Sequence, residues 1–203
     1  MIEEPTKHFR AGQIVIFPTD TLYGVGCRVD SENSIKRLYD IRETPYSKPT
    51  LILAADSKQA FEYGEFDAIA KNLANAFWPG PLTVIIKAKN LVPKMIQGKL
   101  ETIAVRVPNQ PPVINIIKKL GMPILAPSAN FHGRRAPTNF SEIDKDLLAL
   151  VDYAVDLAKL DGGKQMRRKP STLIDLTKKP FKIVRPGAIS EKQIRKALEE
   201  PSK

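Results

Sequence analysis

The stretch from Ile14 to Cys27 constrains the fold most, because an apolar segment passes directly into a cluster of small polar residues. Residues 14–17, Ile-Val-Ile-Phe, have no polar face, as expected of a strand covered on both sides. A proline follows, and then Thr19, Asp20 and Thr21. Ligands of open α/β sheets bind beyond the strand ends, which makes these three residues a candidate site. They equally suit a turn or helix cap, so both interpretations stay open.

Strand and helix patterns alternate along the rest of the 203 residues and predict one mixed α/β sheet with flanking helices. Strands are expected at residues 14–17, 50–54, 82–87, 102–107, 123–126, 153–157, 171–176 and 181–185. Helices are expected at 31–42, 67–77, 112–120 and 141–151, with a short piece at 92–97 and a final helix after a capping box at Ser190. In the second helix, Ile69, Leu73 and Phe77 should face the core. The linker 177–180 is too short for a crossover helix, which excludes a purely parallel sheet.

The length suits a single domain over residues 1–203, with no additional C-terminal domain. No apolar run approaches the roughly 18 residues of a membrane span, and the N-terminus lacks the features of a signal peptide. We therefore expect a cytoplasmic protein without membrane contact. The single cysteine, Cys27, excludes an internal disulfide and a cysteine-based zinc site. A small packed residue is favoured over a nucleophile, because neither His8 nor His132 has a spacing that suggests a base.

The balance of 32 Lys and Arg against 22 Asp and Glu gives a net charge of +10. Such an excess favours an anionic partner, whether nucleic acid, nucleotide phosphate or acidic metabolite, although a solvated surface explains part of it. Arg106 interrupts the apolar strand 102–107, where an unpaired charge is costly. Contact with an anion at the strand end is favoured over an edge strand that faces water.

The usual nucleotide-binding loops are missing from the sequence. There is no G-x-x-x-x-G-K-[ST] motif, and Gly24 and Gly26 lack the third glycine of a dinucleotide fingerprint, since Val29 stands there. A phosphate site would therefore have to be built from side chains at several strand ends. The candidates are Arg42, Lys48, Arg106 and Arg185, with Ser128 and Asn130 as hydrogen-bonding partners.

Seven motifs in fixed order resemble those of the YrdC/TsaC family, the threonylcarbamoyl-AMP synthases. They are the segments 17–26 (FPTDTLYGVG), 48–49 (KP), 78–83 (WPGPLT), 104–108 (AVRVP), 127–130 (PSAN), 171–175 (STLID) and 185–188 (RPGA). They span nearly the whole chain. The resemblance implies a YrdC-like twisted mixed sheet with a concave basic cleft.

The resemblance also implies a reaction. L-threonine, bicarbonate and ATP, with Mg²⁺ on its phosphates, would give threonylcarbamoyl-adenylate and pyrophosphate, for the modification of adenosine 37 in tRNA. A downstream threonylcarbamoyl transferase would accept the adenylate. Carried over by motif, Thr21, Arg106 and Ser171 would bind threonine, and no side chain would act as a covalent catalyst. The nucleotide would be held by Arg42, Lys48, Thr102, Ser128, Asn130 and Arg185.

One motif departs from the family pattern. Relatives usually carry Lys-x-Arg after the first long helix, whereas this chain has Arg42-Glu43-Thr44, which suggests a YciO-like paralogue as an alternative. A further alternative is a module that binds double-stranded RNA or tRNA, favoured by the charge and by the basic run 167–169. Without a further domain, closure of the cleft would come from the loop 162–170.

Overall fold

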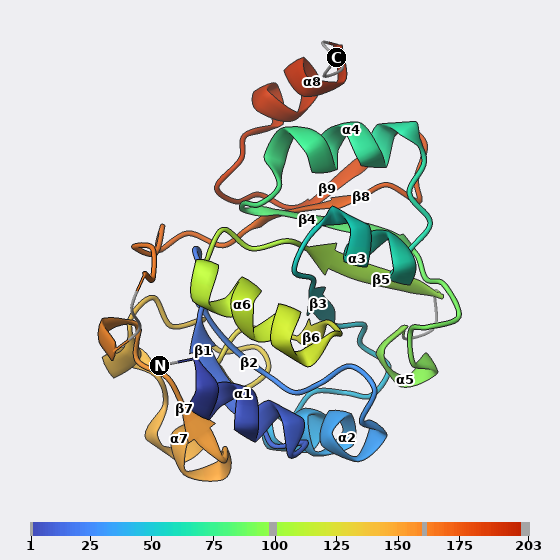
Figure 1. Cartoon of the computed structure of the whole chain (residues 1–203). Coiled ribbons are helices and arrows are strands. Elements are labelled where there is room, and N and C mark those ends of the chain that lie inside the picture. The colour runs from blue at the N-terminus through green and yellow to red at the C-terminus, as the bar shows by residue number, and fades with distance from the viewer. Residues whose placement is uncertain (1, 98–100, 160–161, 200–203) are drawn as a thin grey trace.

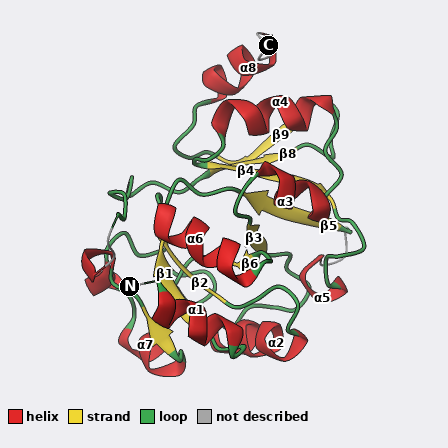
Figure 2. Ribbon diagram, in the orientation of Figure 1, coloured by secondary structure: helices red, strands yellow, loops and turns green. Residues whose placement is uncertain are grey.

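The computed structural model describes residues 2–97, 101–159 and 162–199, which form two β-sheets with flanking helices (Figures 1 and 2). The strands are β1 Val15–Pro18, β2 Tyr23–Gly26, β3 Leu51–Leu53, β4 Leu82–Lys87, β5 Thr102–Arg106, β6 Ile124–Leu125, β7 Tyr153–Ala154, β8 Thr172–Asp175 and β9 Lys182–Arg185. The α-helices are α1 Glu3–Arg10, α2 Glu32–Ile41, α3 Ser57–Tyr63, α4 Ala68–Phe77, α5 Lys94–Gln97, α6 Pro111–Leu120, α7 Lys145–Leu150 and α8 Glu191–Glu199. Two short 3₁₀ helices are η2 Phe140–Glu142 and η3 Leu157–Lys159.

The larger sheet has six strands in the order β6-β3-β5-β4-β8-β9. Strand β5 is parallel to β3 and antiparallel to β4, whereas β4 is parallel to β8. The sheet is therefore mixed, as expected. The hairpin β8–β9 is antiparallel, in agreement with its short linker. Helices α4 and α8 pack against each other beyond this end of the sheet (Figure 1).

A smaller sheet has the order β2-β1-β7, so the expectation of one sheet is wrong. Its strand β1 is buried at all four positions. The two sheets meet where β2 runs beside β6 and the segment that follows it: the Leu125 N–H donates to the Cys27 carbonyl at 2.8 Å, and the Val25 N–H to the Pro127 carbonyl at 2.9 Å. Gly26 permits this approach, because a Cβ there would lie 1.7 Å from the Leu125 carbonyl oxygen.

Most element predictions are confirmed within one or two residues. Strand β4 has the expected bounds, Ser31 and Asp67 cap helices α2 and α4, and Gly121 ends α6 with a φ of 74°. The capping box is formed, since the Ser190 N–H donates to Gln193 Oε1 and the Gln193 N–H to Ser190 Oγ.

Other predictions are wrong. Helices α1 and α3 were not expected, and each is a short element with few buried positions. Asp144 caps a new helix, so the expected helix 141–151 is divided into η2 and α7. The expected strand 153–157 ends at Ala154, and residue 157 is instead the first residue of the 3₁₀ helix η3. In α4, Leu73 is fully buried but Ile69 is 46% exposed and faces away from the core.

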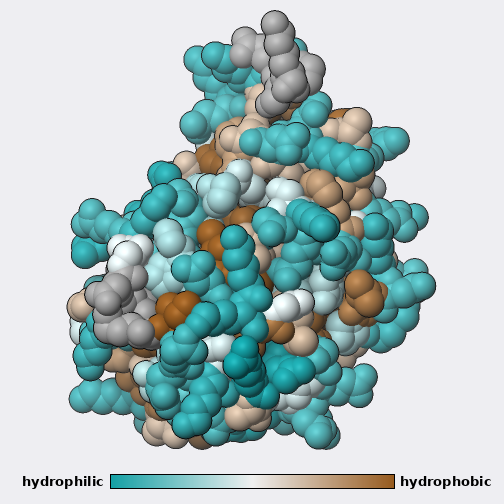
Figure 3. Space-filling view, in the orientation of Figure 1, coloured by the Kyte–Doolittle hydropathy of each residue, from teal (hydrophilic) through white to brown (hydrophobic). Residues whose placement is uncertain are grey.

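The surface view in Figure 3 is mostly hydrophilic, with hydrophobic side chains in small separate areas. Scattered exposed apolar residues are normal for a globular protein and need no partner. No helix in the described ranges combines the length and the apolar content that crossing a membrane requires.

Candidate functional site

A pocket of about 530 Å³ is lined by residues of both sheets and of several connecting loops. Its floor is one face of the six-stranded sheet. Alternate residues line it, which follows from the two-residue period of a strand. They are Leu51 and Leu53 of β3, Thr102, Ala104 and Arg106 of β5, Thr83, Ile85 and Lys87 of β4, Leu173 and Asp175 of β8, and Arg185 of β9.

The charge of the pocket is strongly one-sided. Its described lining residues include six basic side chains, Arg42, Lys48, Lys87, Arg106, Lys178 and Arg185, but one carboxylate, Asp175. A volume of this size accommodates a drug-sized ligand or a nucleotide. The pocket therefore suits an organic anion.

Arg106 lies on an inner strand and is 3% exposed, which rules out the edge-strand interpretation. Its Nε donates to the Gly80 carbonyl at 2.9 Å, its Nη1 to Thr21 Oγ1 at 2.7 Å, and its Nη2 to the carboxylate of Asp20. Burial lowers the pKa of Arg106, and the neighbouring carboxylate opposes that shift. Arg106 was expected to contact an anion at the strand end. The carboxylate of Asp20, within the protein itself, is one such anion.

The cluster Thr19-Asp20-Thr21 satisfies both interpretations of the sequence. Thr19 Oγ1 accepts the N–H groups of Thr21 and Leu22, each at 3.2 Å, which is a local turn of the capping type. Thr19 and Thr21 also line the pocket. The turn is what presents the two hydroxyls to the pocket.

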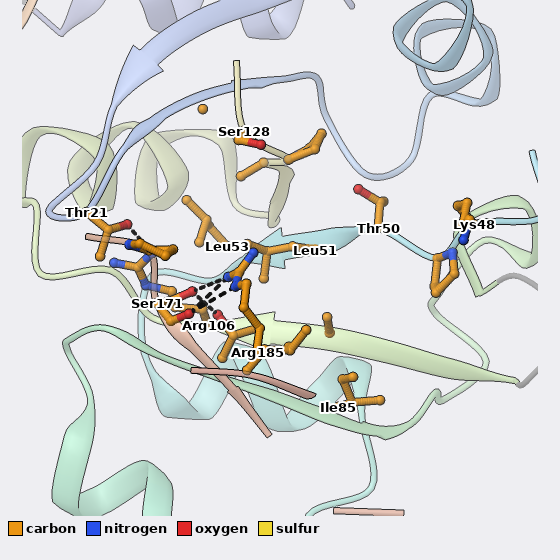
Figure 4. A pocket seen from close by; sticks show the side chains of 18 of the residues that line it. Thr21, Lys48, Thr50, Leu51, Leu53, Ile85, Arg106, Ser128, Ser171 and Arg185 are labelled. Atoms are coloured by element: carbon orange, nitrogen blue, oxygen red, sulfur yellow. Dashed lines mark hydrogen bonds between the residues drawn. The ribbon is translucent and has the colours of Figure 1, made fainter. Parts of the chain in front are cut away.

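Ser171 and Arg185 form a second polar group beside Arg106. Arg185 Nη2 donates to the Ser171 carbonyl at 3.0 Å and to Ser171 Oγ at 3.1 Å. Thr83 Oγ1 lies 2.8 Å from the same Ser171 hydroxyl. Figure 4 shows Thr21, Arg106, Ser171 and Arg185 gathered at one end of the pocket, with Lys48 and Thr50 toward the other.

Arg42 is 8% exposed and organises the opposite wall. Its Nε donates to the carbonyls of Ser128 and Asn130, at 3.2 and 3.1 Å, and its Nη1 to Thr44 Oγ1 at 3.1 Å. Burial lowers its pKa to about 10. These partners are two carbonyls and a hydroxyl, and no described carboxylate pairs with Arg42, so a buried charge faces the pocket without a counterion.

Eight of the nine predicted site residues line this pocket: Thr21, Arg42, Lys48, Thr102, Arg106, Ser128, Ser171 and Arg185. The ninth, Asn130, is 8% exposed and lies behind the wall, where its Nδ2 donates to the carbonyls of Phe131 and Arg134. Sequence reasoning missed Thr83 and Asp175.

Cys27 is confirmed as a packed residue. It is fully buried, and burial raises the pKa of its thiol. His132 is exposed, although it lines the pocket rim. The loop 162–170 is tied to the site, since the Arg167 N–H donates to the Asp20 carbonyl at 2.9 Å and Pro170 lines the pocket. Its closure over a ligand stays a prediction.

The family model Sua5_yciO_yrdC, described as "Telomere recombination", matches residues 7–187. The chain belongs to the Sua5/YciO/YrdC family. This confirms the resemblance inferred from the motifs, and with it the YrdC-like α/β fold.

Within the Sua5/YciO/YrdC family, the chain is 35% identical to a threonylcarbamoyl-AMP synthase of Pyrococcus abyssi, over 94% of this chain and 55% of that protein. It is 34% identical to a putative threonylcarbamoyl-AMP synthase of Methanocaldococcus jannaschii, over 93% of this chain and 86% of that one. The chain thus spans about half the length of the Pyrococcus relative.

Two solved structures are closely similar. P. abyssi Sua5 in complex with L-threonine has a TM-score of 0.89 and 34% identity, over 98% of this chain and 58% of that one. E. coli YciO has a TM-score of 0.82 and 29% identity, over 95% of this chain and 92% of that one.

Proposed function

We propose that the chain is a threonylcarbamoyl-AMP synthase, which joins L-threonine, bicarbonate and ATP into threonylcarbamoyl-adenylate with release of pyrophosphate. One observation carries this proposal. Thr21, Arg106 and Ser171 meet at one end of a strongly basic pocket, in a chain similar to a Sua5 structure that contains L-threonine.

The threonine would bind at the end of the pocket that holds Arg106. Each Nη of Arg106 uses one N–H on Thr21 or Asp20, so a second N–H on each remains for a carboxylate. Two parallel bonds of this kind orient a planar anion. Ser171, which directly precedes β8, would add a hydroxyl to this end of the pocket.

The nucleotide would occupy the rest of the pocket, held by Arg42, Lys48, Thr102, Ser128 and Arg185, with Asn130 shaping the wall from behind. Arg42 supports this role because it is buried without a carboxylate partner among the described residues. A phosphate would supply the missing counterion.

The chemistry needs positioning more than it needs a protein nucleophile. The neutral threonine amine attacks the carbon of bicarbonate, or of carbon dioxide formed from it, and the proton lost by the amine leaves as water with the hydroxide lost by bicarbonate. An oxygen of the resulting carbamate then displaces pyrophosphate from the α-phosphorus. Both reactants of the second step are anions. The excess of cations in the pocket lowers their repulsion and stabilises the charge that develops on the leaving group.

Magnesium would enter on the phosphates of ATP. The described residues hold no group of three or more His, Cys, Asp or Glu that would form a metal cage. Mg²⁺ is commonly held by substrate phosphates and one or two carboxylates, and Asp175 is the carboxylate on the pocket wall. The donor set therefore fits a nucleotide-borne ion, whose charge would offset that of the phosphates.

The downstream acceptor would be a threonylcarbamoyl transferase that acts on tRNA, in the cytoplasm. Binding of tRNA or double-stranded RNA by this chain rests on its net charge of +10 and on the basic run 167–169. A YciO-like role is favoured by one specific feature: Thr44, at the place of the second cation of the Lys-x-Arg motif, accepts a hydrogen bond from Arg42.

The test is release of pyrophosphate from ATP. We expect release to require both L-threonine and bicarbonate, and Arg185→Ala to abolish most of it. Lys182→Ala is the matched control, because Lys182 is a basic residue of the same strand that does not line the pocket. Pyrophosphate release that depends on neither L-threonine nor bicarbonate would exclude the synthase activity and leave the YciO-like alternative. Affinity for tRNA that falls steeply with salt, without pyrophosphate release, would support an RNA-binding module.

A further inference from the structure

Thr83 is a buried hydroxyl of the pocket floor to which the sequence assigned no role. It is 1% exposed, and its Oγ1 lies 2.8 Å from the Ser171 hydroxyl. Thr83 lies in β4 and pairs with Leu173 of the neighbouring parallel strand β8, and Ser171 directly precedes β8. Thr83 is thus fixed by the sheet beside a residue proposed to bind threonine.

Ser171 Oγ has limited hydrogen-bonding capacity. A hydroxyl has one proton to donate and two lone pairs that accept. Arg185 Nη2, at 3.1 Å, fills one lone pair, because a guanidinium only donates. The direction of the bond between Thr83 and Ser171 then decides what Ser171 offers to a ligand.

The two directions have different consequences. If Ser171 donates to Thr83, Ser171 presents a lone pair toward the pocket, which repels a carboxylate. If Thr83 donates to Ser171, both lone pairs of Ser171 are filled and its own proton is free for the pocket. A carboxylate held by the nearby guanidinium group of Arg106 favours the second arrangement, since it needs donors.

We infer that Thr83 is a positioning residue, which donates its proton to Ser171 and thereby holds the Ser171 hydroxyl as a donor toward the carboxylate-bearing end of the substrate. The inference rests on the proposed function, because it takes L-threonine as the ligand at Ser171. It assigns Thr83 a role in amino acid binding and none in ATP binding.

The experiment measures L-threonine binding by calorimetry in the absence of ATP, and the KM values for threonine and ATP, in four proteins. These are the wild type, Thr83→Val, Thr83→Ser and Thr6→Val. Valine keeps the shape of threonine and suits a strand, whereas serine keeps the hydroxyl. Thr6 is the matched control, since it is also 1% exposed and bonds a carbonyl, that of Ile2, in α1.

We expect Thr83→Val to raise the Kd and KM for L-threonine by roughly threefold to tenfold, the size of one buried hydrogen bond, with the KM for ATP unchanged. Thr83→Ser should restore wild-type values, and Thr6→Val should change neither. Equal threonine affinity in wild type and Thr83→Val, or an equal rise in both KM values, would overturn the inference alone. A wild type that binds no L-threonine would overturn the proposed function and the inference together.

Discussion

Arg106 and Thr21 lie 85 positions apart in the chain, yet Nη1 of the arginine donates to the threonine hydroxyl at 2.7 Å in the buried end of the pocket. The carboxylate of Asp20, next to Thr21, is the charge partner of the same guanidinium. Both side chains of this ion pair are almost fully buried. The pair therefore links the small sheet to the large one at the proposed substrate site.

Asp20→Asn should destabilise the protein strongly. The substitution keeps the shape of the side chain but leaves Arg106 as a buried charge without its partner, which costs about 3–5 kcal/mol. Chemical denaturation measures the free energy of unfolding. Asp30→Asn is the control, because the Arg28–Asp30 pair is largely exposed and should contribute at most about 1 kcal/mol. Equal effects of the two substitutions would contradict a structural role for the buried pair.

Arg42→Met should weaken ATP binding. The variant removes a buried cation that faces the pocket, and the loss of a charge-assisted contact to phosphate corresponds to roughly tenfold to a hundredfold in affinity. It should also lower the melting temperature, because the carbonyls of Ser128 and Asn130 lose their donor. Arg37→Met is the control, because Arg37 lies in α2, just before Arg42, but is paired with Asp152. Unchanged ATP affinity in Arg42→Met would show that Arg42 does not contribute to nucleotide binding.

Gly26→Ala should prevent the two sheets from joining. The added Cβ would lie 1.7 Å from the Leu125 carbonyl oxygen, which is backbone and has little freedom to move. A loss of roughly 4 kcal/mol or more is expected, within the range of severe core disruptions. Gly24→Ala should be milder, because its Cβ would meet the Phe17 ring at 3.3 Å. Thermal denaturation of both variants checks this order. A higher melting temperature for Gly26→Ala than for Gly24→Ala would contradict it.

Cys27 should make the protein less stable at alkaline pH. Burial raises the pKa of its thiol, so the folded chain keeps the proton that the unfolded chain loses above a pH of about 8.5. Stability from this group is complete below that pH and falls above it, by about 1.4 kcal/mol per pH unit. Cys27→Ala lacks this dependence. The unfolding free energies of the wild type and Cys27→Ala are measured from neutral to alkaline pH. The advantage of the wild type should decrease as the pH rises, and a constant difference would contradict the burial argument.

The sequence predicted the elements well where local chemistry decides them. Strand β4 is a mostly apolar run rich in β-branched residues that follows a proline- and glycine-containing turn, and Gly121 takes the left-handed conformation that ends α6. The division into two sheets was not predictable in this way. Strand β1 pairs with β7, more than a hundred positions later, and no local pattern encodes that choice.

The site residues were predicted through the family motifs more than through the local pattern. Arg106 stood out as a charge in an apolar strand. The strand is apolar because it lies in the buried interior of the sheet, where Arg106 is buried too. Asn130 belongs to a motif, yet its side chain lies behind the pocket wall, because a linear motif does not tell which side chain faces the ligand. Thr83 was missed since a threonine is unremarkable in a strand until its partner is known.

The most direct test of the central claim is detection of the product itself. The protein is incubated with ATP, L-threonine and isotopically labelled bicarbonate, and the mixture is separated and analysed by mass spectrometry. The account predicts threonylcarbamoyl-adenylate that carries the label, in an amount equal to the pyrophosphate released. Pyrophosphate without a labelled adenylate, or no adenylate with all three substrates present, would contradict it.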